Sequence, residues 1–206
     1  MKEDRYAQQA EDWTDRAYAD AATYLTHRAE LVVGLGPELV PGDEVLDLAC
    51  GDGGLGDLLL ARGFRYCGVD STPEMVEAAR RRLGERAVIE AGDLNEYVPP
   101  APVAATTVFR AIYYAHDRRM FFGHVAAFTE KKLVFDLNPR QYRLEEVLAD
   151  LRDAGFSRVA LRPFFVPQTR ALPRPVLASA RCLERSGPLA RLALRFRFTY
   201  VLAAMR

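Results

Sequence analysis

Short apolar stretches alternate with longer segments of mixed polarity along most of the chain. The apolar stretches are typical of buried strands, which we expect at 44–49, 65–70, 87–90, 103–109, 133–137, 156–166 and 195–205. Between them, helical spacing of apolar residues predicts helices at 54–62, 73–83, 118–128 and 143–154. Repeated strand–helix alternation predicts an α/β fold with a parallel sheet wrapped by helices.

The segment before the first strand has a different pattern. Residues 5–35 contain no proline, and their first glycine is Gly34, so we expect one or two helices there. Aromatic side chains at Tyr6, Trp13 and Tyr24 share one face of this segment. We therefore divide the chain into an N-terminal helical cap, residues 1–36, and a Rossmann-like domain, residues 37–206.

The first predicted strand runs into a glycine-rich turn, VLDLACGDGGLG, and the second ends in an acid, YCGVD. Gly51, Gly53 and Gly56 satisfy the G-x-G-x-x-G pattern, and Asp70 follows at nearly the distance expected for a ribose ligand. Strand, turn, helix and acidic strand end together indicate a nucleotide-binding unit. The glycines alone fit either a dinucleotide or another adenosine cofactor.

Two further acids distinguish between these cofactors. Asp47 lies inside the first strand, where a buried carboxylate needs a donor or a cation such as an ammonium group. Asp52 lies inside the glycine turn, where it would repel a pyrophosphate and tolerate a sulfonium ligand. Asp47 thus favours a cofactor that carries an ammonium group, and Asp52 favours a sulfonium methyl donor over NAD.

DLACGDG, GVDSTPEM and AGDL, in this order and spacing within Gly42 to Asn138, resemble the class I S-adenosylmethionine-dependent methyltransferases. The resemblance implies a doubly wound, mostly parallel seven-stranded sheet with one antiparallel strand, helices on both faces and an N-terminal helical lid. It implies S-adenosylmethionine as cofactor and S-adenosylhomocysteine as product. The implied cofactor-binding residues are Asp47, Ala49 and Gly51 at the methionine part, Asp70 and Ser71 at the ribose, Met75, Asp93 and Leu94 at the adenine, and Arg110.

The segment after the fourth strand, RAIYYAHD, is dense in polar aromatic and titratable residues, and ligands of open α/β sheets lie at these strand ends. His116 is our first choice for a general base, and the alternative is that it only opens the next helix with Asp117 as N-cap. Tyr113 and Tyr114 are the other catalytic candidates, or else core residues. Arg110 can bind a carboxylate or phosphate, or neutralise a neighbouring acid.

Substrate candidates come from two further segments. Asn138 and Arg140 follow the fifth strand and either face the acceptor or form an Asn-Pro turn. Trp13 and Tyr18 would reach the substrate if the N-terminal helices form the lid found in the family. His27 and His124 lie on predicted helices and are interpreted as structural. No His or Cys pair has metal-ligand spacing, so we expect no metal.

Composition adds one asymmetry to this interpretation. Basic and acidic residues balance over the 206 residues, yet every basic residue from Arg140 onward is an arginine. Such a segment either forms a solvated surface or contacts an anionic partner. The three cysteines are interpreted as buried free thiols. With no signal-peptide pattern and no run long enough to span a bilayer, a cytoplasmic protein is expected.

Three functional hypotheses remain. The first is methyl transfer to an oxygen, nitrogen or carbon atom of a small-molecule metabolite or natural product, because no nucleic-acid module is recognisable. The second is a methyltransferase that acts on nucleic acid or a lipid headgroup through the arginine-rich C-terminal third, where PLARLALRFRF could lie on a membrane or form a terminal strand. The third is an NAD(P)-binding oxidoreductase or a non-catalytic Rossmann protein. The sequence leaves the oligomeric state open.

Overall fold

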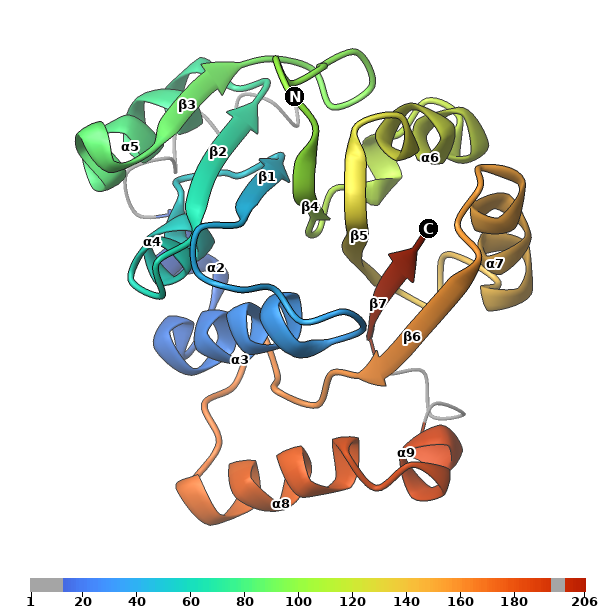
Figure 1. The fold of residues 1–206 in the computed structure, drawn as a ribbon. Helices are drawn as coiled ribbons and strands as arrows, with labels where there is room; N and C mark the ends of the chain where they lie inside the picture. The colour runs from blue at the N-terminus through green and yellow to red at the C-terminus, as the bar shows by residue number, and fades with distance from the viewer. Residues whose placement is uncertain (1–12, 194–198) are drawn as a thin grey trace.

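A computed structural model describes residues 13–193 and 199–206. Its centre is a seven-stranded sheet in the order β3-β2-β1-β4-β5-β7-β6, with helices packed on both faces (Figure 1). The strands are β1 (Glu44–Leu48), β2 (Arg65–Asp70), β3 (Val88–Ala91), β4 (Val103–Val108), β5 (Thr129–Leu137), β6 (Arg158–Pro163) and β7 (Tyr200–Met205). β7 is antiparallel to β5 and β6, and the other pairs are parallel. The predicted α/β fold is confirmed.

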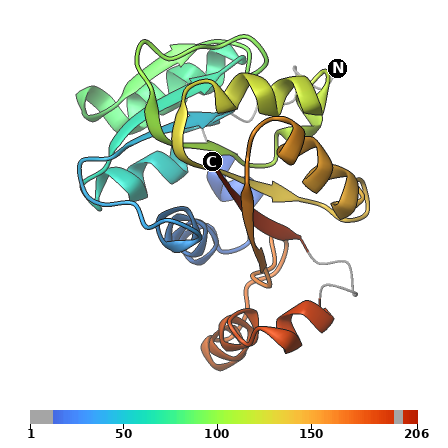
Figure 2. The same cartoon turned by 45° about the vertical axis from the view of Figure 1, so that its right-hand side comes forward.

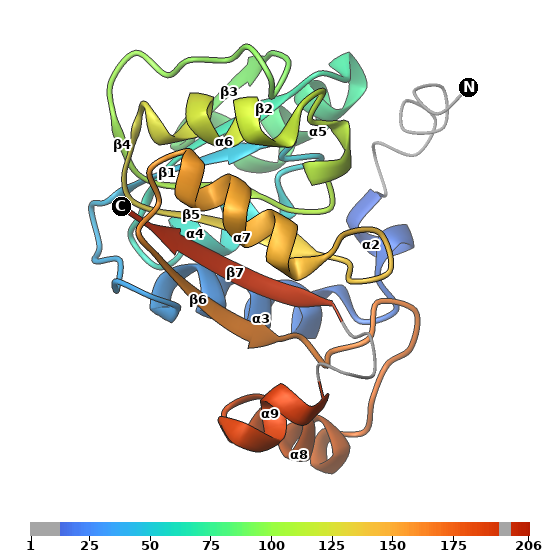
Figure 3. The ribbon, with the colours of Figure 1, turned by 90° about the vertical axis from the view of Figure 1, so that its right-hand side faces the viewer.

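Both faces of the sheet are covered. The helices are α2 (Trp13–Ala17), α3 (Ala21–Gly34), α4 (Gly54–Leu60), α5 (Pro73–Leu83), α6 (Arg118–Ala126), α7 (Leu144–Asp153), α8 (Arg174–Glu184) and α9 (Pro188–Ala193), with 3₁₀ turns η2 (Gly84–Arg86) and η3 (Ile112–Tyr114). The view in Figure 3 places α6 and α7 in front of the sheet and α3 and α4 behind it. This double burial explains why the predicted strands are apolar runs without alternation.

Successive side chains of one strand enter different apolar clusters, as the two-residue period of a strand requires. Val134 packs in the cluster that includes residues of α3, α4 and α5, whereas its neighbours Leu133 and Phe135 pack in the cluster of α6 and α7. α3 is thus part of the main core. The proposed cap boundary at residue 36 stays a prediction, since residues 1–12, including Tyr6, lie outside the described residues.

The C-terminal third differs from the expected pattern. The segment 188–193, which we considered as part of a terminal strand, is helix α9, and α8 precedes it. Figures 1 and 2 show both helices projecting from the body below β6 and β7. The terminal strand begins at Tyr200, and the expected positions 195–198 lie outside the described residues. On α8, Cys182 is exposed, so the prediction of a buried thiol is wrong there.

Candidate functional site

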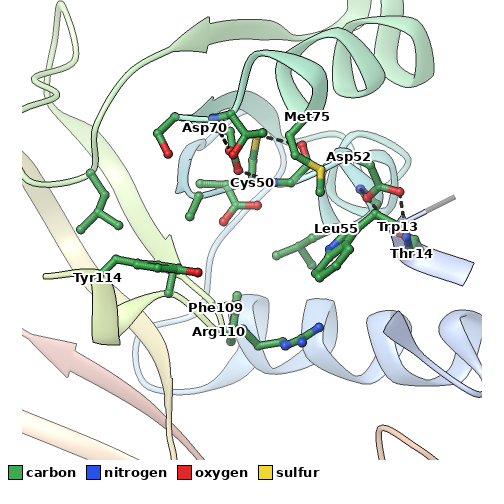
Figure 4. A pocket seen from close by; sticks show the side chains of 18 of the residues that line it. Trp13, Thr14, Cys50, Asp52, Leu55, Asp70, Met75, Phe109, Arg110 and Tyr114 are labelled. Carbon is green, nitrogen blue, oxygen red and sulfur yellow. Dashed lines mark hydrogen bonds between the residues drawn. The ribbon is translucent and has the colours of Figure 1, made fainter. Parts of the chain in front are cut away.

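A cavity of about 400 Å³ opens at the carboxyl ends of β1, β2, β3 and β4 and is bordered by α2 and α3 (Figure 4). β1 lies between β2 and β4, so the chain order reverses there. Such switch points are where open α/β sheets bind ligands, because loops from adjacent strand ends diverge. The cavity therefore lies where the sequence analysis placed the nucleotide-binding unit.

The turn after β1 brings the backbone against this cavity. Ala49, Gly51 and Gly53 all have left-handed backbone conformations, with φ of 62°, 58° and 76°. Little room remains behind the turn, because a Cβ on Gly56 would lie 2.5 Å from the Tyr66 ring. The glycines thus permit both the turn and the packing of α4 on β2, as the G-x-G-x-x-G pattern predicts.

Asp70 is held in place at the end of β2. Its Oδ2 accepts a hydrogen bond from the Gly51 N–H at 2.9 Å, and its Oδ1 accepts one from the Thr72 N–H at 2.9 Å. Burial raises the pKa of this carboxyl, while both backbone donors oppose the rise. Asp70 and its neighbour Ser71 line the cavity. The carboxylate oxygens keep acceptor capacity for a diol.

Asp47 is buried at 3% exposure, as deeply as Asp52. It accepts hydrogen bonds from the Tyr66 hydroxyl at 2.8 Å and the Thr107 hydroxyl at 2.7 Å. Burial raises its pKa to about 6, although both hydroxyls and the Arg28 guanidinium oppose the rise. Because no cation pairs with Asp47 among the described residues, a cationic ligand would stabilise its charge.

Asp52 has a structural partner that the sequence did not predict. Its carboxylate accepts hydrogen bonds from the Thr14 N–H at 3.1 Å and the Thr14 hydroxyl at 2.6 Å, and it pairs with Arg82 at 2.8 Å. These contacts tie α2 to the glycine turn. The acid thus positions the N-terminal segment over the cavity, and its charge is already compensated.

Another part of the cavity lining is apolar with one acid. Met75 and Leu94 are buried and line it. Asp93 also lines it and accepts hydrogen bonds from the backbone N–H and the side-chain amide of Asn95, both at 2.7 Å. Two apolar surfaces and a carboxylate can hold a flat heterocycle that carries an amino group.

The three catalytic candidates lie at the cavity rim. Tyr113 and Tyr114, in η3, are 41% and 38% exposed, so neither belongs to the apolar core. His116 is exposed and lines the cavity, and its backbone N–H donates to the side-chain oxygen of Asn95 at 3.0 Å. Asp117 caps α6 by accepting from the Met120 N–H. The capping hypothesis is confirmed for Asp117, and the catalytic role of His116 stays a prediction.

Trp13, Tyr18 and Arg110 meet at one wall of the cavity. The Arg110 guanidinium carbon lies 5.5 Å from the centre of the Trp13 ring and 5.6 Å from the centre of the Tyr18 ring. Behind them, Arg28 donates to the Tyr18 and Tyr24 hydroxyls. Cation–π contacts of this kind order an arginine without neutralising its charge.

Several lining residues were missed by the sequence analysis, namely Thr14, Leu25, Arg28, Leu55 and Phe109. For Arg28 a signal exists, because a charged residue on the apolar face of a helix must find buried partners. Phe109 is one of these buried partners of Arg28, because the centre of its ring lies 4.2 Å from the Arg28 guanidinium carbon.

Asn138 and Arg140 do not line this cavity. The Arg140 N–H donates to the Asn138 side-chain oxygen at 3.0 Å, as expected for the Asn-Pro turn that was the alternative interpretation. His27 and His124 make internal contacts elsewhere, with Glu184 and with the Tyr97 carbonyl. In the described part of the chain, no three His, Cys, Asp or Glu side chains are arranged to hold a metal.

Comparisons with known proteins agree with this geometry. A family model described as a methyltransferase domain matches residues 45–132, from β1 into β5. Trans-aconitate 2-methyltransferase of Rhizobium meliloti is 37% identical over 103 residues, which are 48% of this chain and 39% of the relative. The enzyme of the same name from Rhodopseudomonas palustris is 30% identical over 118 residues, 54% of this chain and 46% of the relative. Residues 45–132 are therefore similar to a methyltransferase domain, as the sequence motifs predicted.

Solved structures share the fold of this chain. A TehB-like S-adenosylmethionine-dependent methyltransferase from Corynebacterium glutamicum has a TM-score of 0.67 at 15% identity, covering 100% of this chain and 98% of that one. A second such enzyme, from Mesorhizobium loti, has a TM-score of 0.65 at 16% identity, covering 93% and 99%. The chain spans less than half the length of the curated relatives it matches.

Proposed function

We propose that this protein is a methyltransferase that transfers a methyl group from S-adenosylmethionine to an oxygen, nitrogen or carbon atom of a small molecule. The observation that carries the proposal is one cavity at the β1–β4 switch point that brings together Asp47, Asp70 and Asp93. Asp47 lies within β1, Asp70 ends β2 and Asp93 follows β3, and the resemblance assigned each of them a contact with a different part of the cofactor. The methyl group of the bound sulfonium supplies the electrophile.

The residues present fit this cofactor. Asp70 is oriented by two backbone donors and would bind the ribose hydroxyls, with Ser71 beside it. Asp93, between the apolar Met75 and Leu94, would accept from the adenine amino group. Asp47, with Ala49 and Gly51 above it, would bind the methionine ammonium directly or through a water. The buried negative charge of Asp47 then acquires a directly paired cation, which the described residues do not supply.

The chain's own contribution to the reaction is alignment and the exclusion of water. Trp13 and Tyr18 close one wall of the cavity, and the contacts of Thr14 with Asp52 hold that wall. Tyr113 would border the acceptor at the rim. His116 would take a proton from an acceptor whose nucleophile must lose one, since a neutral imidazole can do so near neutral pH. Placement supplies most of the rate for acceptors without such a proton.

A small-molecule acceptor is supported over the alternatives by two observations. The strand order, with antiparallel β7 between β5 and β6, differs from the 3-2-1-4-5-6 order of dinucleotide-binding domains. In the arginine-rich third, Arg181 pairs with Glu30 and Arg162 donates to the Glu184 carbonyl, so part of that positive charge serves the fold. Two of the relatives are trans-aconitate 2-methyltransferases, so a small organic acid is the first acceptor to test.

Product formation tests the proposal. The protein is incubated with S-adenosylmethionine and trans-aconitate, other small acids, phenols and amines, and S-adenosylhomocysteine is measured by mass spectrometry. We expect acceptor-dependent product with wild type and with the surface control Asp153→Asn, and its loss in Asp70→Ala. Product formed only with RNA or anionic vesicles would refute a small-molecule acceptor. We also propose a cytoplasmic location. Within the described residues, no helix is both long and apolar enough to cross a membrane.

A further inference from the structure

Arg110 is held in an unusual conformation at the end of β4. It is one of two non-glycine residues with a positive φ in the described chain, at 55°, and the other is Ala49 of the glycine turn. The conformation is fixed by a hydrogen bond from the Arg110 N–H to Asp136 Oδ1 at 2.7 Å. Strained backbone persists where the surrounding structure over-determines it, and such positions cluster at functional sites. Here the strain directs a long cationic side chain along the cavity wall.

The guanidinium group of Arg110 is ordered without being neutralised. It lies over the Trp13 and Tyr18 rings, and its Nη1 is buried without a hydrogen-bond partner among the described residues. No carboxylate of the described residues forms an ion pair with it. A buried guanidinium N–H without an acceptor is costly, because the group has lost water and gained nothing in its place.

Neighbouring charges already have partners within the protein. Arg28 donates to two tyrosine hydroxyls and lies 3.5 Å from Asp136, and Arg82 pairs with Asp52. Asp70 accepts one hydrogen bond from a backbone N–H at each oxygen. Arg110 therefore differs from Arg28 and Arg82. Among the described residues, no carboxylate forms an ion pair with its guanidinium group. The alternative from the sequence was that Arg110 neutralises a neighbouring acid. Among the nearby acids, Asp93 accepts from Asn95, and no ion pair joins a described carboxylate to Arg110.

We propose that Arg110 binds a carboxylate of the acceptor, which makes the acceptor an organic acid. This inference rests on the proposed function. Figure 4 shows Arg110 across the cavity from Asp70 and Met75, and the Trp13 ring lies between Arg110 and Met75. The opposite wall holds the residues assigned to the cofactor's ribose and adenine, so the Arg110 wall is left for the acceptor. A planar guanidinium pairs with a carboxylate through two parallel hydrogen bonds, and one such group balances one carboxylate charge.

Binding to the protein saturated with S-adenosylhomocysteine tests this proposal. Calorimetry measures trans-aconitate, succinate, benzoate and trans-cinnamate, each beside its fully methylated ester. The variants are Arg110→Gln, Arg110→Lys and the surface control Arg119→Gln, and each is checked for an unchanged melting transition. Every substitution at position 110 places an L side chain at the same φ, so the backbone strain is matched between variants.

We expect at least one acid to bind wild type and the control, and its ester to bind neither. Arg110→Gln should weaken that acid by about tenfold to a hundredfold, the value of a charge-assisted pair, and Arg110→Lys by less. S-adenosylhomocysteine should bind all variants within about threefold of wild type, because the proposal pairs Arg110 with the acceptor's carboxylate and not with the cofactor.

Three results would overturn the inference. They are an absence of acid binding to the saturated wild type, acid binding that is unchanged in Arg110→Gln, and a loss of S-adenosylhomocysteine affinity as large as the loss of acid affinity. The last result would assign Arg110 to the cofactor's own carboxylate. A wild type that fails to bind S-adenosylhomocysteine refutes the proposed function itself, so the two failures are distinguishable.

Discussion

Replacing Asp47 by asparagine should stabilise the ligand-free protein while weakening its binding of the cofactor. The carboxylate is 3% exposed, and its pKa rises from 3.8 to about 6 in the folded state. Its two partners are the hydroxyls of Tyr66 and Thr107. Because a hydroxyl both donates and accepts, an asparagine amide of the same shape can keep both contacts.

The size of the effect follows from the pKa difference. A carboxyl whose pKa is raised by folding contributes stability below its unfolded pKa, and this contribution is lost as the pH rises through the folded pKa. A difference of about two in pKa corresponds to roughly 3 kcal/mol between the fully protonated and fully ionised limits. Between pH 5 and pH 8, the wild type should lose about 1.4 kcal/mol that Asp47→Asn does not lose.

Urea denaturation of both proteins at pH 5 and pH 8, without ligand, measures this difference. The free energy of unfolding of Asp47→Asn relative to wild type should increase by about 1.4 kcal/mol at the higher pH. Binding of S-adenosylhomocysteine should move the opposite way, with weaker affinity for the variant at pH 8. If the relative stability of the two proteins is the same at both pH values, the charge of Asp47 is not costly in the folded state.

Three further predictions concern the elements around the cavity. Gly56→Ala should lower the free energy of unfolding by about 1–3 kcal/mol, because the new Cβ meets the Tyr66 ring at 2.5 Å, whereas Gly123→Ala, with no neighbour within 4 Å on α6, should not destabilise. Thr14→Val removes the hydroxyl that donates to Asp52, so limited proteolysis should cut near α2 faster than in wild type, and an unchanged rate would deny Asp52 its anchoring role. Lys132→Met should cost about 1–3 kcal/mol of stability, measured by denaturation, because the Val33 and Leu35 carbonyls lose the donor that ends α3. An equally stable Met variant would contradict that capping role.

The central fold was predictable because its signals are local. Strands buried on both faces are continuous apolar runs, and Gly155 ends the helix before β6, with φ of 93°, as expected. The projection α8–α9 was not predicted, because few of its side chains enter the core. Leu177 packs against the body, whereas Val176, Leu183, Leu189 and Leu192 are exposed. Without a buried stripe, alternating arginine and apolar residues favoured a strand.

The site divides in the same way. Asp47, Asp70 and Asp93 could be placed because each directly follows or lies within a strand of a recognisable spacing. Arg28 could not, because its partner Asp136 lies 108 residues away in sequence and only the sheet brings them together. The strained backbone of Arg110 likewise depends on Asp136, at the end of β5. Tertiary contacts of this kind leave no periodic trace in the sequence.

The most direct test of the account is calorimetric titration of the purified wild type with S-adenosylhomocysteine and, separately, with NAD. We predict binding of S-adenosylhomocysteine in the micromolar range, no detectable binding of NAD, and loss of the S-adenosylhomocysteine signal in Asp70→Ala. Binding of NAD in place of S-adenosylhomocysteine, or an affinity that Asp70→Ala leaves unchanged, would contradict the assignment of this cavity to the methyl donor.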